Sequence, residues 1–138
     1  MSGEAIICAL LNAAAPVAGL VAADGIWPGQ VPEGKALPAI AYRQVSAVPT
    51  NSVSLAENRR TVRARIEVTP VVPLSKYDQL KALRRAIKLA CANQVGTVAG
   101  FDHVATWCES EGPDIPDRAL GTLEQGIDFM VTFSEALT

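Results

Sequence analysis

The sequence predicts an α+β fold: a two-layer sandwich in which a mainly antiparallel sheet carries about two helices packed on one face. Two segments, one near the start of the chain and one over residues 75–91, have apolar residues at helical spacing. Several other segments alternate apolar and polar residues, as strands with one buried face do. The predicted order is helix, three strands, helix, two strands, which is typical of α+β folds rather than of alternating α/β folds.

Length and composition favour a single globular domain over residues 1–138. Of these residues, 49% are hydrophobic and 19% charged, which excludes an intrinsically disordered chain. Alanine supplies much of the apolar content and aromatic residues only 5%. We therefore expect a thin, aliphatic core of the kind that often depends on partner subunits for part of its burial.

The first predicted helix begins at Ser2, a residue type that caps helices, and runs for about three turns. Pro16 is expected to end or restart it, and residues 17–22 can add one more turn. The apolar positions that define this helix are Ile6, Ile7, Leu10 and Leu11.

A turn and two extended segments follow. Asp24-Gly25 marks the turn, and residues 26–28 form a short extended piece. Residues 29–38 contain two glycines and two prolines and are expected to be irregular. Residues 39–48 are predicted to form a strand. The polar residues 49–58 then form a loop longer than the usual hairpin connection, which suggests a role in binding.

The clearest strand and the main helix come next. Apolar and charged residues alternate over residues 62–68, so one face of this strand is expected to be buried. Pro70 and Pro73 are expected to end it. Ser75 is expected to cap a helix over residues 75–91, whose apolar stripe includes Tyr77 and has 3–4–3 spacing.

The last part of the chain is predicted to contain two strands. Gly96 and Gly100 interrupt the chain before a strand at about residues 103–109. Gly112-Pro113 opens a loop that ends near Gly121. The final strand has Ile127, Phe129, Val131 and Phe133 inward and Asp128, Thr132 and Ser134 outward.

Charge is distributed unevenly along the chain. Residues 59–88 carry nine basic residues against two acidic ones, whereas residues 89–138 carry one basic residue against eight acidic ones. The formal net charge of −2 argues against a generic binder of nucleic acids or anionic membranes. The arginines of residues 59–65 could contact nucleic acid, but this segment lacks aromatic residues for base stacking. Pairing with acids of the same fold or of a protein partner is favoured.

The charge-free stretch of residues 5–23 is long enough to span a bilayer. It is mostly alanine, however, it contains Asn12, Pro16 and Gly19, and no positive residue flanks it. A membrane anchor or signal peptide would have a positive flank and a richer Leu/Ile core. We expect a soluble protein with no membrane partner.

Catalytic and metal-binding chemistry has little support. His103 is the single histidine, and no nucleophile elbow, phosphate-binding loop or zinc-protease motif occurs. Asp114 and Asp117 could form a carboxylate pair or a cation site, but a turn is the favoured interpretation. We therefore expect no enzyme, no cofactor and no metal. The cysteines have neither disulfide-framework nor zinc-site spacing: Cys8, Cys91 and Cys108.

Several segments, in their order along the chain, resemble one protein family. They are an Ala/Leu-rich N-terminal helix, Ile26-Trp27-Pro28, Leu37-Pro38-Ala39-Ile40-Ala41-Tyr42, an arginine-bearing strand, a long helix and the closing strand Gly126-Ile127-Asp128-Phe129-Met130-Val131. Together they resemble the tail-completion, or tail-terminator, proteins of long-tailed bacteriophages and prophages. The similarity covers nearly the whole chain, although residues 110–121 do not align with the family pattern.

This resemblance implies a structural protein without catalysis. Family members form a ring, usually a hexamer, that caps the tail tube at its set length and presents the surface for head–tail joining. The implied partners are further copies of the chain, the major tail tube protein and a neck, or head-completion, protein. The implied location is the tail–neck junction of the virion, after assembly in the host cytoplasm. A neck adaptor (head–tail connector) or minor tail component is the nearest alternative, and a small nucleic-acid-binding protein the more distant one.

A head-to-tail ring needs two different contact patches on each subunit. Basic residues of the arginine-bearing strand and the main helix, for which we expect few internal partners on the helix, are candidates for one patch. Acidic residues near the end of the following strand are candidates for the other, and the polar loop is a third candidate. The candidate residues are Arg63, Arg65, Lys81, Arg84, Arg85, Lys88, Glu109, Glu111, Asn51, Ser52 and Ser54.

Overall fold

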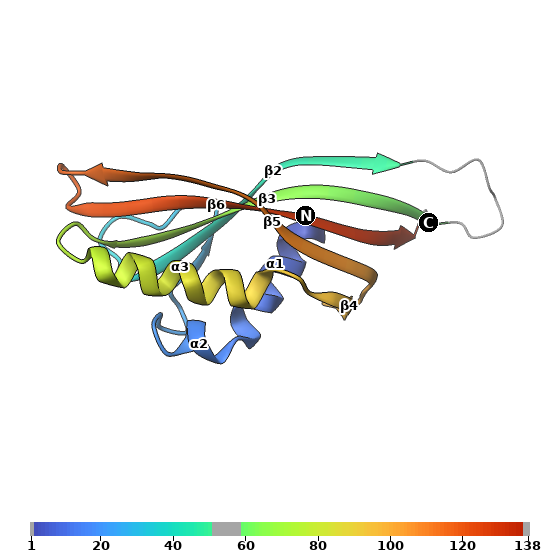
Figure 1. The fold of residues 1–138 in the computed structure, drawn as a ribbon, viewed down its shortest axis with the longest axis horizontal. Helices are drawn as coiled ribbons and strands as arrows, with labels where there is room; N and C mark the ends of the chain where they lie inside the picture. The colour runs from blue at the N-terminus through green and yellow to red at the C-terminus, as the bar shows by residue number, and fades with distance from the viewer. Residues whose placement is uncertain (1, 51–58, 137–138) are drawn as a thin grey trace.

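The computed structural model describes residues 2–50 and 59–136, and these form one sheet with helices on one of its faces (Figure 1). The strand order is β1-β2-β3-β6-β5-β4. Only β1 runs parallel to its neighbour among these strands. The predicted α+β class is confirmed, with a mixed but mostly antiparallel sheet. The strands are β1 (Ile26–Pro28), β2 (Ala39–Thr50), β3 (Arg59–Pro73), β4 (Val95–Val98), β5 (Phe101–Asp117) and β6 (Thr122–Ala136).

Two helices, α1 (Ser2–Ala13) and α3 (Tyr77–Cys91), cover the inner face of the sheet, and the short α2 (Ala15–Ala18) packs against both of them (Figure 1). Pro16 lies in the first turn of α2, so it restarts the helix as predicted, although the added turn is earlier than residues 17–22. Within the part of the chain that the structure describes, no helix has both the length and the apolar character needed to cross a membrane.

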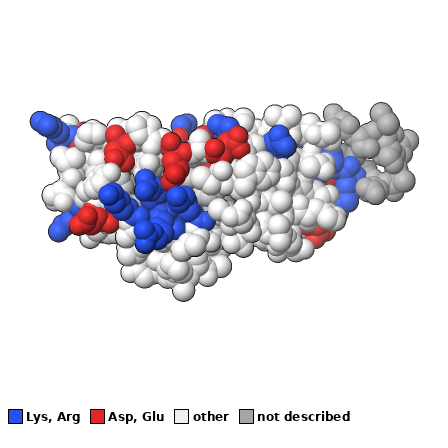
Figure 2. All heavy atoms as spheres, in the orientation of Figure 1, with Lys and Arg blue, Asp and Glu red and all other residues white. Residues whose placement is uncertain are grey.

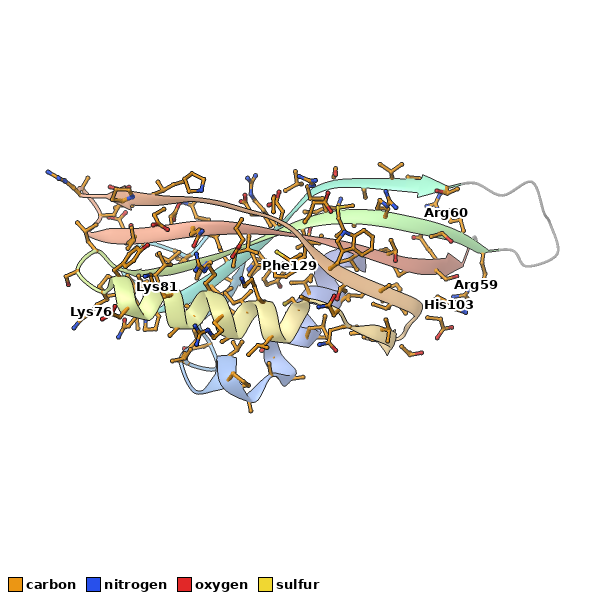
Figure 3. The ribbon with its side chains drawn as sticks, viewed as in Figure 1. Arg59, Arg60, Lys76, Lys81, His103 and Phe129 are labelled. Carbon is orange, nitrogen blue, oxygen red and sulfur yellow. The ribbon has the colours of Figure 1, made fainter. Side chains whose placement is uncertain are left out.

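The core lies between the sheet and the helices because each strand buries alternate residues. On β3 and β6, the inward positions Ala64, Ile66, Ile127 and Phe129 are fully buried. Phe129, the largest of the fully buried side chains, lies between the sheet and α3 (Figure 3). The helices close this layer with the apolar residues Ile6, Ile7, Leu11, Leu80, Leu83 and Ile87.

Two strands are longer than predicted, and in one of them proline was expected to end the strand. β3 continues through Pro70 to Pro73. Pro70 lies opposite Ile40 of β2, whereas the β3–β6 ladder has no pairs between Val68 and Val71. The sheet therefore accommodates a residue without an N–H where that ladder is interrupted. β2 likewise extends beyond residue 48 to Thr50, past a bulge between Gln44 and Ser46.

The predicted loop at residues 112–121 is largely wrong. Residues 112–117 continue β5, and only residues 118–121 form the turn to β6. Register shifts between Cys108 and Ser110 and between Glu111 and Asp114 absorb the irregularity that Pro113 introduces. β4 was also not predicted, because Gly96 appeared to interrupt the chain at that point.

The cap predicted for the main helix is wrong as well. Lys76, not Ser75, is the N-cap residue of α3, and it makes no side-chain capping hydrogen bond. The N–H of Lys76 donates to the carbonyl of Pro73 at 2.9 Å, so a backbone turn precedes the helix. Tyr77 was assigned to the apolar stripe but is 44% exposed at the first position of α3.

Candidate assembly surfaces

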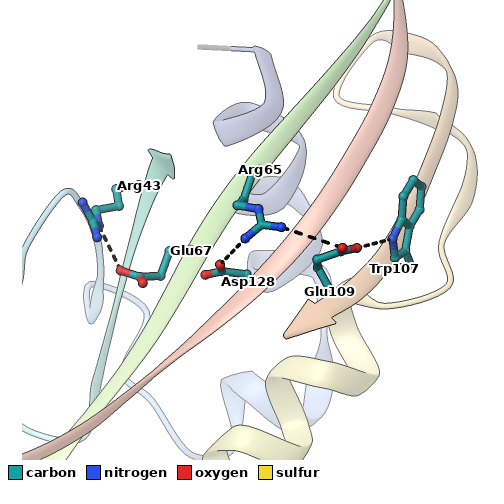
Figure 4. A network of polar contacts seen from close by, with 6 residues as sticks. All are labelled: Arg43, Arg65, Glu67, Trp107, Glu109 and Asp128. Carbon is teal, nitrogen blue, oxygen red and sulfur yellow. Dashed lines mark hydrogen bonds and ion pairs between the residues drawn. The ribbon is translucent and has the colours of Figure 1, made fainter. Parts of the chain in front are cut away.

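The face of the sheet that lies opposite the helices carries paired charged side chains (Figure 4). Arg65 on β3 donates to the Asp128 carboxylate on β6 at 3.1 Å and lies 3.7 Å from Glu109 on β5. Glu109 also accepts a 2.8 Å hydrogen bond from the indole N–H of Trp107. We refer to this side of the sheet as the open face. Of the predicted contact residues, Arg65 and Glu109 thus pair with each other inside one subunit.

Arg63 also lies on β3 and is exposed. Its guanidinium carbon lies 5.7 Å from the ring centroid of Trp107 on β5, a cation–π contact that reaches across β6, the strand between β3 and β5. Although exposed, the Arg63 side chain therefore already contacts a side chain of its own subunit.

Two of the four predicted basic residues on α3 have internal partners, contrary to our expectation. Lys88 Nζ lies 3.2 Å from Glu111 Oε1, and Arg84 Nε lies 3.6 Å from the same oxygen. Arg84 also donates to Gln125 Oε1 at 3.2 Å. Because β5 continues beyond residue 109, Glu111 lies alongside α3 instead of in a projecting loop.

The other two basic residues lie on the outer side of α3. Lys81 Nζ lies 4.9 Å from the ring centroid of Tyr77. Arg85 is exposed, and its side chain makes no hydrogen bond or ion pair with another described residue. Figure 2 shows basic side chains gathered over α3, with acidic side chains beside them. Tyr77, Lys81, Arg85 and Leu89 follow one another at four-residue intervals, and we call this row the α3 ridge.

Apolar exposure at both ends distinguishes the α3 ridge from an ordinary charged helix face. Tyr77 is 44% exposed and Leu89 is 66% exposed, whereas Leu80, Leu83 and Ile87 are buried on the opposite side of the helix. The ridge combines apolar and cationic groups and points away from the sheet, except that the Tyr77 hydroxyl donates to the Asp114 carboxylate on β5 at 3.0 Å.

A groove crosses one end of the open face. It consists of two adjoining pockets of about 390 and 400 Å³ that share Val31, Val71, Leu120 and Thr122. One wall is the segment 29–37, and the other is the turn between β5 and β6. We call this feature the open-face groove. Leu120 is 54% exposed in it, so the groove offers apolar surface to solvent.

Local contacts fix the wall formed by residues 29–37. The N–H of Gly29, at φ +80°, donates to the carbonyl of Tyr42 at 2.7 Å. Lys35 Nζ lies 5.4 Å from the ring centroid of Trp27 on β1. The groove is therefore bounded by a segment that is tied to the sheet, although this segment has no regular secondary structure.

Glu124 of β6 lines the groove and is half-buried. Its side chain makes no ion pair or hydrogen bond with any other residue that the structure describes. Burial raises the pKa of this carboxyl above the ordinary value, and the nearby carboxylates of Asp117 and Glu67 raise it further. The Glu124 carboxylate thus has no cationic partner among the described side chains of the groove.

The described residues contain no arrangement suited to chemistry. No group of three or more His, Cys, Asp or Glu side chains among them lies close enough to hold a metal ion. The three cysteines are free, and burial raises the pKa of the Cys91 thiol to about 12. His103 is exposed at the start of β5. The predicted loop residues Asn51, Ser52 and Ser54 lie outside the described residues.

The open-face groove was not predicted, because its lining comes from the segment 29–37, β2, β3 and β6. No local pattern in the sequence brings these segments together. The α3 ridge did leave a signal, since the four-residue spacing of Tyr77, Lys81, Arg85 and Leu89 is visible in the sequence.

Comparison with known families identifies the chain. The family described as "Tail completion protein gp17" matches residues 5–119, which is most of the chain. The chain belongs to the tail completion protein gp17 family. The resemblance inferred from the sequence is thereby confirmed. As a member of this family, the chain is a structural phage virion protein and not an enzyme.

Solved structures confirm that the fold is shared. A chain of the "Virion of native gene transfer agent (GTA) particle" superposes with a TM-score of 0.69 and 12% sequence identity, covering 96% of this chain and 97% of that one. A second solved structure has a TM-score of 0.58 and 15% identity, with 98% and 96% of the two chains covered. No curated protein matches the chain. At these identities, the structural similarity concerns the fold of this tail completion family member.

Proposed function

We propose that this tail completion family member forms a ring that caps the tail tube, stops its polymerisation and provides the surface for head–tail joining. The observation that carries the proposal is the family match over residues 5–119. A hexamer is the stoichiometry expected from the family resemblance. The tube protein and a neck protein would contact the ring at the tail–neck junction.

The surface of the subunit supports a closed head-to-tail assembly. Such a ring needs two different patches on different sides of each subunit. The α3 ridge lies on the side of the helix layer, and the open-face groove lies on the opposite side of the sheet. Both patches carry exposed apolar side chains, namely Tyr77 and Leu89 on the ridge and Leu120 in the groove.

The pairing of half of the basic residues inside the subunit supports a protein partner over nucleic acid. Arg43, Arg59, Arg60, Arg65, Arg84 and Lys88 all form internal ion pairs. A nucleic-acid footprint would instead leave many of these cations free to neutralise phosphates. We therefore favour assembly with other protein subunits over DNA binding as the function of this chain.

Purified protein tests the proposal directly. Light scattering over a concentration series, combined with negative-stain imaging, is expected to show closed rings at high concentration or on tail tubes. Addition to tubes assembled without the completion protein is expected to cap them and to make them competent for joining to heads. A protein that stays monomeric both at high concentration and in the presence of tubes would contradict the proposal.

The same preparation distinguishes the nearest alternative. A neck adaptor would dock on portal–connector complexes and not on the ends of tail tubes. A nucleic-acid-binding protein would bind DNA with an affinity that falls steeply as salt rises, whereas an acidic assembly subunit would not.

A further inference from the structure

We propose that the α3 ridge of one subunit docks in the open-face groove of the next subunit, with Arg85 opposite Glu124. The occupant of the groove is thus a second copy of this chain. This inference rests on the proposed ring function and names the two surfaces that would join its subunits.

Charge complementarity is the first argument. Arg85 is an exposed cation, and Glu124 is a half-buried carboxylate in the groove, and neither forms an ion pair with another described residue. By contrast, Lys88 and Arg84 on the same helix already share Glu111. A carboxylate that is partly removed from water gains most when a cation approaches it. Arg85 supplies a planar guanidinium that can bind it through two hydrogen bonds.

Shape and apolar character provide the second argument. The ridge from Tyr77 to Leu89 covers twelve residue steps, or about 18 Å of helix. Its ends expose Tyr77 and Leu89, and the groove exposes Leu120 beside Val31 and Val71. An amphipathic helix that places residues at four-residue intervals into an apolar groove is a recurrent mode of protein recognition.

The position of the two surfaces provides the third argument. Leu80, Leu83 and Ile87 face the sheet, so the α3 ridge faces away from it. The groove residues Glu67 and Glu124 alternate with buried residues along β3 and β6, so they face the other side. A subunit therefore cannot place its own ridge in its own groove. Because the two patches are different, the contact can be head-to-tail, and this geometry closes into a ring when the rotation between subunits allows it.

Charge reversal tests the inference. We expect Arg85→Glu and Glu124→Lys each to raise the dissociation constant for assembly at least tenfold, because each brings like charges together. The double variant is expected to recover most of this loss. Sedimentation velocity over a concentration series measures the effect on rings formed in solution. If rings require the tube, occupancy on capped tubes is measured by quantitative labelling.

A matched control separates position from net charge. Lys76 is an exposed cation at the start of α3, but it is not part of the ridge. Lys76→Glu changes the charge of the subunit as Arg85→Glu does, and it is expected to leave assembly unchanged. Thermal unfolding by circular dichroism shows whether each variant is folded. If a reversal variant does not fold, the neutral variants Arg85→Ala and Glu124→Gln replace it, with a smaller expected weakening.

Cross-linking gives an independent measurement. Subunits carrying Arg85→Cys are mixed with subunits carrying Glu124→Cys, and a dimer of the two kinds is expected with a bis-maleimide cross-linker whose spacer matches the reach of an Arg–Glu pair, because a direct disulfide needs Cα atoms within about 7 Å. Wild-type protein, with its three native cysteines, is the control.

The outcomes also separate this inference from the proposed function. If wild-type rings form but neither reversal weakens them, or the cross-link does not exceed the control, the ridge–groove contact is wrong and the ring remains. If no ring forms under any condition, the proposed function itself fails. Weakening by both single variants together with recovery in the double variant would support the contact.

Discussion

Lys88 Nζ lies 3.2 Å from Glu111 Oε1, and this ion pair joins α3 to β5 within one subunit. Arg84 approaches the same carboxylate at 3.6 Å. Glu111 therefore neutralises part of the basic surface of α3 from inside the fold. The cations of α3 that remain outside this pairing are Lys81 and Arg85 on the ridge and Lys76 at the N-cap.

We expect this internal pairing to contribute measurably but modestly to stability. A double-mutant cycle with Lys88→Ala and Glu111→Ala should give a coupling energy of about 0.2–1 kcal/mol in urea unfolding of the monomer, because both side chains are partly exposed. The coupling should decrease at high salt. A control cycle with Lys76→Ala in place of Lys88→Ala should give a coupling energy near zero. Zero coupling for Lys88, together with weakened assembly of the Glu111 variant, would instead place Glu111 at a subunit contact.

The core should depend strongly on one aromatic side chain. Phe129→Ala removes the largest of the fully buried side chains, so we expect a loss of about 3–5 kcal/mol in the free energy of unfolding. Val95→Ala on β4, where the side chain is 79% exposed, should change it by less than about 0.5 kcal/mol. Chemical denaturation of the two variants measures both effects. If both variants lost a similarly small part of the free energy of unfolding, the core would not be centred on β6.

Gly3 allows α1 to approach β3 closely. A Cβ atom at this position would lie 2.9 Å from Ala64 Cβ and 3.1 Å from Ile66 Cδ1. Gly3→Ala should therefore destabilise the fold by about 1–3 kcal/mol, although alanine is the better helix former. Gly19→Ala is the matched control, because its Cβ would meet no atom closer than 3.6 Å and its φ is −75°. We expect that control to leave the melting temperature unchanged or to raise it slightly.

Glu124 should make stability depend on pH. Its pKa in the folded protein is raised above the ordinary 4.5 by burial, and then by Asp117 and Glu67. Between the ordinary and the raised pKa, the folded state binds more protons than the unfolded state, so stability falls as pH rises through this window. Glu124→Gln should abolish this decrease in stability with rising pH, so the variant should be more stable than the wild type at about pH 7.

The comparison is made by urea unfolding at about pH 4 and pH 7, at a concentration where the protein is monomeric. The advantage of Glu124→Gln should be larger at pH 7 than at pH 4. Glu33→Gln removes one carboxylate from the exposed segment 29–37 and serves as the charge control. An advantage of the same size at both pH values would show that ionisation of Glu124 is not its source.

The amino-acid sequence by itself determined the elements whose signals are local. Alternation over residues 62–68 and the 3–4–3 spacing of α3 depend only on neighbouring residues, and both elements occur where they were predicted. The same holds for the inward positions of β6 and for the family, whose motifs follow one another along the chain.

Only the tertiary structure decided the lengths of β3 and β5 and the surfaces available for assembly. Proline and glycine suggested strand ends at residues 70 and 112, yet both strands continue, because pairing with β2 and β6 and local register shifts accommodate these residues. The pairing of Glu111 with α3 and the groove around Glu124 each join residues that are far apart in the chain. Such contacts depend on sheet register and on which face each strand presents, and these arise only when the whole sheet is assembled.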